Sequence, residues 1–231
     1  RLALTKQGAG TLSLTGVNSY AGSTTINGGT ISITNLGNGG IAGGIGAASN
    51  VASNLVINGG TLRYAGTSTT TDRAFTIGAG GAAIDASGTG SLTFSTPGVT
   101  LAYGTTNQAR SLTLTGSSSA SLVNTFGKVI ANNGSGATSL TKSGSNTWAL
   151  SAANTFTGPT SVSAGTLALT AGSLGSTAIS VSPGATLSVL TAGNYGTGAT
   201  GAGTAGASLS LGAGSVFSMA NDGGAGLLTV G

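Results

Sequence analysis

Side chains that could perform acid–base or metal chemistry are scarce in this 231-residue sequence. The acidic residues are Asp72, Asp85 and Asp222, and there is neither His nor Cys. Serine–histidine triads, thiolate nucleophiles and sites built from His or Cys ligands are therefore excluded. A pair of carboxylates can still cleave a glycosidic bond. Asp72 and Asp85, with Arg73 as a neighbouring cation, are the candidate catalytic set.

The cations are spread singly along the chain, although the formal net charge is +4. Nucleic-acid binding needs clustered Lys and Arg side chains, and membrane-surface binding needs a basic amphipathic helix. Neither pattern is present. No run of about 18 apolar residues occurs either, so we expect no membrane-spanning helix.

The composition could indicate a disordered segment, because glycine supplies 44 residues and charged residues only 4%. Hydrophobic residues nevertheless make up 39% of the chain. They occur in short stretches that alternate with Ser or Thr, such as 12–14, 92–94 and 112–114. One face of each stretch is then apolar and the other polar. We therefore expect a folded, all-β protein.

An internal repeat organises the sequence. Residues 4–33 recur as residues 140–169, without a gap. A shorter unit, made of a small apolar strand, a glycine turn and a second strand, recurs at irregular intervals. It is found at 26–33, 57–64, 77–85, 162–169, 181–189 and 211–219.

Short strands, Gly and Asn turns and a repeated unit predict a right-handed parallel β-helix, or β-solenoid. Its coils would stack about 4.8 Å apart, with glycine supplying positive φ at the corners. An antiparallel sandwich or barrel stays open as an alternative, because Asn-Gly-Gly could form a hairpin turn. We expect one domain over 1–231, with projecting Gly-rich loops at 35–50 and 191–208. No signal peptide is visible, so we expect a fragment or processed part of a larger chain.

The pattern LTKxGxxTxxLxxxNxxxGxTxxxxGTLxL, carried by 1–33 and 139–169, resembles the autotransporter-associated (passenger-associated transport) β-strand repeat. Segments 44–66, 71–94 and 107–124 are also similar to sequences common in these proteins. The resemblance implies a β-helical passenger of a large bacterial surface or secreted protein of the type V secretion kind. In such proteins the repeat is associated with export and stalk-building and is not a catalytic signature.

Equivalent positions of the two repeat copies could contact a ligand. Lys6 aligns with Lys142, and Asn18 aligns with Asn154. We favour solvated coil corners for the two lysines. For the two asparagines we favour a hydrogen bond to their own turn.

Aromatic and glycine-rich motifs have structural interpretations as well. The aligned pairs Tyr20/Phe156 and Leu12/Trp148 fit core positions better than sugar-stacking ones. Two matches to G-x-G-x-x-G, at 196–201 and 201–206, open no expected helix. We therefore predict no dinucleotide site and no other cofactor.

The catalytic set and the threonines also have a structural alternative. Asp72 suits a turn beside an Arg73 that makes an exposed salt bridge, and Asp85 suits a strand end. We therefore predict no catalytic or metal site.

Threonines at 69–71, 113 and 115 could bind ice if they formed in-register rows on successive coils. We expect them not to keep a constant coil phase.

These observations predict a non-enzymatic β-solenoid at the bacterial cell surface or secreted, acting as a stalk, spacer or adhesive rod. Its partner would be a cell-surface or extracellular-matrix molecule, or copies of itself. Uncapped solenoid ends present unpaired strand edges, and a weakly charged surface does not repel copies. A self-assembling filament or sheath subunit is therefore the alternative. A polysaccharide-degrading enzyme and an ice-binding solenoid are weaker alternatives, and we expect no nucleic acid and no membrane insertion.

Overall fold

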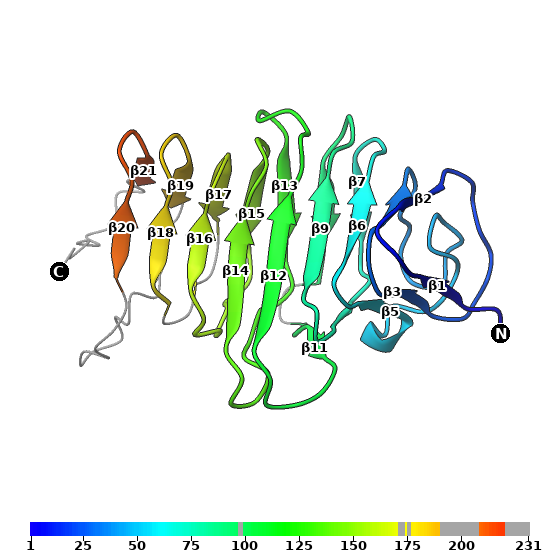
Figure 1. The fold of residues 1–231 in the computed structure, drawn as a ribbon. Helices are drawn as coiled ribbons and strands as arrows, with labels where there is room; N and C mark the ends of the chain where they lie inside the picture. The colour runs from blue at the N-terminus through cyan, green and yellow to red at the C-terminus, as the bar shows by residue number, and fades with distance from the viewer. Residues whose placement is uncertain (97–98, 171–173, 175–176, 190–207, 220–231) are drawn as a thin grey trace.

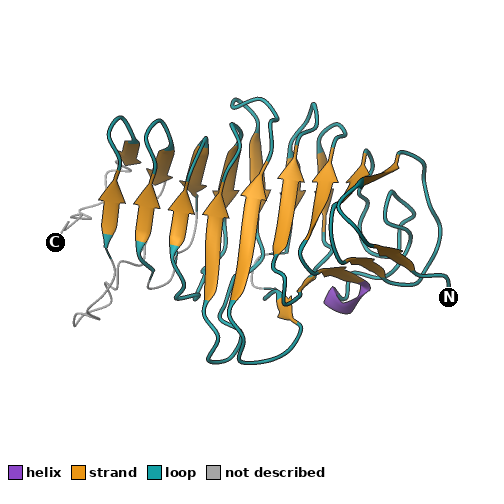
Figure 2. Ribbon diagram, viewed as in Figure 1, coloured by secondary structure: helices purple, strands orange, loops and turns teal. Residues whose placement is uncertain are grey.

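The computed structural model describes residues 1–96, 99–170, 174, 177–189 and 208–219. These residues form strands and loops (Figure 2), with one turn of 3-10 helix at Ala52–Asn54. No helix in these ranges is long and apolar enough to cross a membrane. The expected loop at 191–208, the two G-x-G-x-x-G matches and Asp222 lie outside the described ranges, apart from Ser208.

The strands stack into a right-handed parallel β-helix, as the sequence predicts, and every pair of named strands is parallel. In Figure 1 the coils advance from the N-terminal end on the right to the C-terminal end on the left. The front strands run upward, and the chain then crosses over the top to the rear strands. A right-handed path is the one that right-twisted strands favour in parallel crossovers.

Three sheets form the sides of the helix. The nine-stranded sheet contains β2 (Thr11–Leu14), β4 (Thr30–Ile33), β6 (Gly60–Tyr64), β9 (Ala82–Ala86), β12 (Arg110–Thr115), β14 (Thr138–Lys142), β16 (Thr160–Val162), β18 (Ile179–Val181) and β20 (Leu209–Leu211). The five-stranded sheet contains β1 (Leu4–Lys6), β3 (Thr24–Ile26), β5 (Leu55–Ile57), β8 (Thr76–Ile77) and β11 (Ala102–Tyr103). The seven-stranded sheet contains β7 (Thr69–Thr71), β10 (Leu92–Phe94), β13 (Val123–Phe126), β15 (Thr147–Leu150), β17 (Thr166–Leu169), β19 (Thr186–Val189) and β21 (Val216–Met219).

The core lies between the sheets and is built from inward-facing ranks of side chains. Four of its aromatic rings pack together: Phe126 contacts Phe75, Phe94 and Trp148, with ring centroids 6.1, 5.7 and 6.4 Å away. These tilted and edge-on contacts are the geometry that aromatic rings prefer. Trp148 and Phe156 are fully buried, which confirms the core prediction for them. In the first repeat copy, Leu12 and Tyr20 are half-buried.

The two repeat copies occupy different pairs of sheets. In residues 4–33 the strands alternate between the five-stranded and nine-stranded sheets, whereas in 140–169 they alternate between the nine-stranded and seven-stranded sheets. Coils between them, from β5 to β13, place strands in all three sheets. The repeat therefore encodes four strands of two successive coils and the corners that join them, and not a fixed place in the coil.

The loop at 35–50 contains no named strand, but the expectation that it projects is wrong. Leu36, Ile45 and Ala48 are at most 3% exposed. Gly43 also forms an antiparallel bridge with Asn18 of the preceding coil. Burial of these apolar side chains draws the loop onto the N-terminal coils.

Candidate functional site

The two described carboxylates, Asp72 and Asp85, have separate partners. Asp72 follows β7 of the seven-stranded sheet, where Oδ1 accepts the N–H of Gly39 at 2.7 Å and Oδ2 accepts Nδ2 of Asn50 at 3.0 Å. Asp85 lies on β9 of the nine-stranded sheet, with Oδ2 3.7 Å from Nε of Arg63. Stacking of the coils therefore does not assemble the two acids into one site.

Arg73 is buried and makes no exposed salt bridge, contrary to the sequence-based expectation; its side chain is 2% exposed. The loop at 37–48 turns its carbonyl groups inward, and the arginine side chain has five N–H donors in a fixed geometry to satisfy them. Burial lowers the pKa of Arg73, and the nearby Asp72 and Tyr20 oppose this shift. The accepting carbonyls are those of Gly37 (3.0 Å), Ala48 (2.9 Å), Asn38 (3.3 Å), Ile41 (3.1 Å) and Gly46 (2.9 Å).

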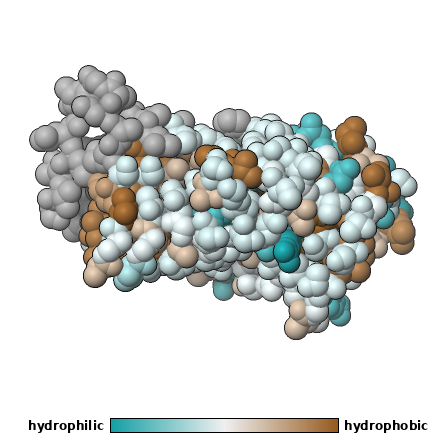
Figure 3. Space-filling model, turned by 90° about the horizontal axis from the view of Figure 1, so that it is seen from above, coloured by the Kyte–Doolittle hydropathy of each residue, from teal (hydrophilic) through white to brown (hydrophobic). Residues whose placement is uncertain are grey.

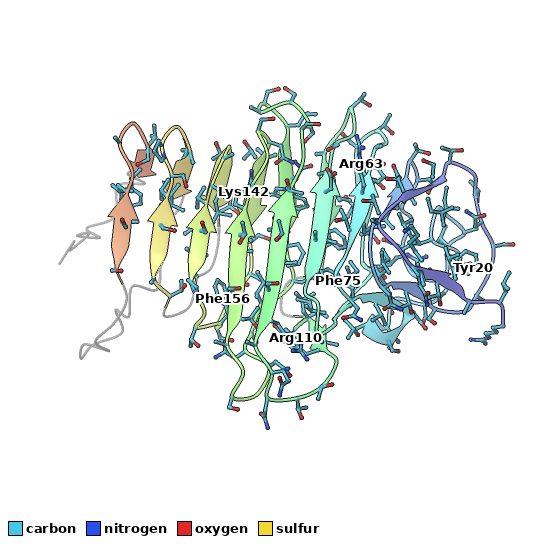
Figure 4. The ribbon with its side chains drawn as sticks, viewed as in Figure 1. Tyr20, Arg63, Phe75, Arg110, Lys142 and Phe156 are labelled. Carbon is cyan, nitrogen blue, oxygen red and sulfur yellow. The ribbon has the colours of Figure 1, made fainter. Side chains whose placement is uncertain are left out.

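Lys142 is fully buried at the corner between β14 and β15 (Figure 4). Its Nζ donates to the carbonyls of Ser143 at 2.6 Å and Gly144 at 2.9 Å, both in its own corner. It also donates to the carbonyl of Ala164 in the next coil, at 3.0 Å. One ammonium therefore joins two successive coils through three main-chain carbonyls.

Lys6 makes the equivalent contacts in the first repeat copy. Its Nζ donates to the carbonyls of Gln7 at 2.8 Å, Gly8 at 2.7 Å and Gly28 at 3.2 Å. Each acceptor aligns in the sequence with an acceptor of Lys142. We call this arrangement of a repeat lysine and three carbonyls the lysine clamp.

The prediction of solvated corner lysines is therefore wrong. Lys142 pairs in register with Leu114 and Val162, so its side chain lies in an inward-facing rank of the nine-stranded sheet. Its aliphatic stem takes the place of a core residue, and its charged end reaches the corner. Gly165 adopts a φ of +63°, and a Cβ there would lie 2.9 Å from Nζ, so the clamp needs glycine at this position. Burial lowers the pKa of Lys142 to about 8.

The same chemistry recurs at two further buried cations. Lys128 Nζ donates to the carbonyl of Asp72 at 2.9 Å and contacts the hydroxyl of Thr96. Burial lowers the pKa of Lys128, and Asp72 opposes this shift. Arg110 donates to the carbonyls of Thr105 and Ala109 at 2.7 and 2.8 Å. Buried cations bound to main-chain carbonyls thus recur through the described interior, and sequence reasoning missed them.

The asparagine prediction is confirmed. Asn18 Nδ2 donates to the carbonyl of Gly16 at 3.3 Å, and Asn154 Nδ2 donates to the carbonyl of Ala152 at 2.9 Å. Asn154 Oδ1 also accepts the N–H of Ile130 at 2.9 Å, which ties its turn to the preceding coil.

The threonines at 69–71, 113 and 115 keep no common coil phase, as expected, because the first three lie on the seven-stranded sheet and the other two on the nine-stranded sheet. Thr113 belongs to an outward-facing rank of the nine-stranded sheet that carries Thr or Ser in almost every strand. The rank beside it, which contains Thr115, is interrupted by the Arg63–Asp85 ion pair. The in-register rank consists of Thr11, Thr30, Thr61, Ala83, Thr113, Thr141, Ser161, Ser180 and Ser210.

Replacing Lys142 by Met tests the lysine clamp. The substitution keeps an apolar stem but leaves three carbonyls without their donor, so we expect the free energy of unfolding to fall by about 1–3 kcal/mol. Denaturant unfolding measures the change. Thr141→Ala, on the outward face of the same strand, is the matched control and should change stability by less than about 0.5 kcal/mol. Equal effects of the two substitutions would contradict the clamp.

The pKa of Lys142 also predicts a pH dependence. Its pKa is about 8 in the folded chain, against 10.5 for an ordinary lysine. Between these pH values the unfolded chain binds more protons, so Lys142 makes stability rise with pH. Subtracting the unfolding free energies of Lys142→Met from those of the unaltered chain isolates this contribution. A difference that stays flat or falls between pH 8 and pH 10.5 would contradict the shift.

Arg73→Lys tests how the loop at 35–50 is held. A lysine has three donors without the planar geometry of arginine, so several loop carbonyls lose their partner. We expect the amides of Gly40 and Gly44 to exchange with deuterium about tenfold faster, with the amides of β14 unchanged. Arg63→Lys, at the half-exposed ion pair, should leave both regions unchanged. Uniform faster exchange in Arg73→Lys would show a global loss of stability instead.

Comparisons with known proteins agree with this architecture. Residues 4–33 and 140–169 each match the family model of the passenger-associated-transport-repeat. The chain is 48% identical over 145 residues to the adhesin BmaC autotransporter of Brucella suis biovar 1 (strain 1330). This alignment covers 62% of the chain and 4% of that relative's length. No solved structure matches the chain.

The two repeat matches contain the two lysine clamps. The alignment with the Brucella protein is longer than the two matches together. The chain therefore carries two passenger-associated-transport repeats and is similar to a small part of an autotransporter adhesin.

Proposed function

We propose that this chain is a non-catalytic segment of an adhesive surface rod, which acts as a stalk or spacer and displays binding surfaces along its side. The supporting observation is the uninterrupted stacking of nine strands in one sheet. At a strand spacing of about 4.8 Å, the segment extends a rod by about 40 Å.

The polar side chains support a structural role. The carboxylates of Asp72 and Asp85 belong to different sheets, and each is engaged by a neighbouring amide, hydroxyl or guanidinium group. Lys128, Lys142 and Arg73 are directed at main-chain carbonyls inside the protein. Each of these groups stabilises a corner or a loop.

The surface chemistry and the relative's name support adhesion. The related Brucella protein is described as an adhesin. The side of the rod seen in Figure 3 is mostly pale, with separate small hydrophilic areas and with hydrophobic areas in several places, including both ends. Such a surface favours contacts made by neutral polar groups over long-range charge attraction.

Adhesion can be tested with beads coated with the folded chain. We expect coated beads to adhere to animal cells or extracellular matrix more strongly than beads coated with the heat-unfolded chain. Equal adhesion of the two preparations, or none, would contradict the adhesive function.

A parallel assay with acidic and neutral polysaccharides tests catalysis. We expect no turnover. Turnover that disappears in Asp85→Asn, but persists in the exposed control Ser111→Ala on β12, would establish the enzyme alternative.

A second proposal is end-to-end association of copies into a filament or sheath. It is supported by exposed apolar side chains at both ends of the rod: Leu2, Val17 and Ile41 are 75%, 67% and 60% exposed, and Leu211 and Val216 are each 49% exposed. Association of copies would remove these apolar side chains from water.

Sedimentation velocity tests this association. We expect species that grow with protein concentration, and less growth in Leu211→Lys, which places a charge at the end of the rod. Thr89→Lys, on a loop away from both ends, is the matched control. A clean monomer at high concentration would contradict self-assembly.

A further inference from the structure

Two loops project together from one side of the rod. Residues 104–109 precede β12 and residues 131–137 precede β14, and both lie at the lower edge of Figure 1. We call the two loops together the spur. All residues of 104–109 are exposed, as are Gly134 and Ser135.

Hydrogen bonds between the two loops hold the spur in one conformation. The side-chain amide of Asn133, which is 4% exposed, donates to the carbonyls of Thr105 at 2.6 Å and Gln108 at 3.0 Å. Asn107 donates its N–H to the carbonyl of Asn133 at 3.0 Å, and its Oδ1 accepts the N–H of Ser135 at 3.0 Å. Because the loops are already ordered, ligand binding would cost little further conformational entropy.

Backbone packing and a buried cation stabilise the same conformation. Gly134 has a φ of +62°, and a Cβ at this position would lie 2.2 Å from Oδ1 of Asn107. Asn107 itself has a φ of 59°, in the left-handed region. Beneath the tip, Arg110 donates to the carbonyls of Thr105 and Ala109 (Figure 4). The exposed tip is therefore held by hydrogen bonds between the two loops and by a buried cation beneath it.

The exposed side chains of the spur restrict the kind of ligand. Thr105, Thr106, Asn107, Gln108 and Ser135 present hydroxyl and amide groups, without a charged or aromatic side chain at the tip. Nucleic acids and acidic polymers require clustered cations, and protein interfaces depend mainly on buried Trp, Tyr and Arg. Hydroxyl and amide groups both donate and accept, which matches the hydroxyl groups of an uncharged sugar.

We propose that the spur is a binding surface for a neutral polysaccharide. The proposal rests on the adhesive function proposed above and names its ligand class. A polymer would compensate for weak single contacts, because many copies of the spur on a cell surface engage one chain at once.

Binding of immobilised full-length chain to dextran, mannan and galactan tests the proposal, with polygalacturonate as the acidic comparison. The test variant is Thr106→Ala with Gln108→Ala, whose side chains take no part in the hydrogen bonds described above. We expect binding of at least one neutral polymer, weakened about tenfold or more in this variant. The matched control, Thr67→Ala with Thr89→Ala, removes exposed hydroxyls from other loops and should bind like the unaltered chain.

Gly134→Ala gives a second readout, because it displaces Asn107 while leaving the clamps and the aromatic core in place. We expect lost polysaccharide binding with an unchanged β-sheet circular dichroism spectrum.

Unchanged binding in both spur variants, or binding of polygalacturonate alone, would overturn the spur proposal. If coated beads still adhere to cells in that case, the adhesive function stands without the spur. Failure of the unaltered chain to adhere would contradict the adhesive function itself.

Discussion

Corners are the places where a parallel β-helix loses its main-chain hydrogen-bond ladder, and their carbonyl groups need donors from elsewhere. This protein supplies many of those donors from buried cations. Lys6 and Lys142 each satisfy carbonyls of two successive coils, and Arg73 satisfies five carbonyls of a single loop. Buried unpaired polar groups are costly, so these bonds determine which coil conformations are allowed.

The lysine clamp also explains how one sequence repeat can serve two places in the fold. The contacts of Lys6 and Lys142 are equivalent residue by residue, although the first clamp joins the five- and nine-stranded sheets and the second joins the nine- and seven-stranded sheets. A clamp needs only a strand, a glycine corner and the following coil. It can therefore be used at any corner of a three-sided coil.

Much of the fold could be predicted from the sequence, because alternating apolar residues and glycine turns report directly on strands and corners. The burial of Trp148 and Phe156 followed from their apolar partners in the other copy. The interior cations were missed because charge was taken to indicate solvent exposure. The alternation in Leu140-Thr141-Lys142 places the lysine on the same face as the leucine, and this signal could have identified the clamp. No comparable signal precedes Arg73, whose acceptors lie 25 or more residues away in the sequence.

The corner chemistry and the surface chemistry fit a common role. Most described cations lie inside the rod, where they fix loops and corners, and the outer face is largely Thr, Ser, Asn and Gln side chains, with the Arg63–Asp85 ion pair as an exception. A rod built in this way can present rigid neutral loops such as the spur at fixed positions along its length. Its interactions would then depend little on the ionic strength outside the cell.

The most direct test of the account is the reactivity of Lys142 toward an amine-acylating reagent, read by mass spectrometry on a Thr141→Lys variant. The lysine introduced by this substitution points outward from the same strand and serves as an internal reference. A buried lysine clamp predicts rapid acylation of the introduced lysine and little acylation of Lys142 until the chain is unfolded. Equal acylation of both lysines in the folded chain would contradict the buried lysine clamp.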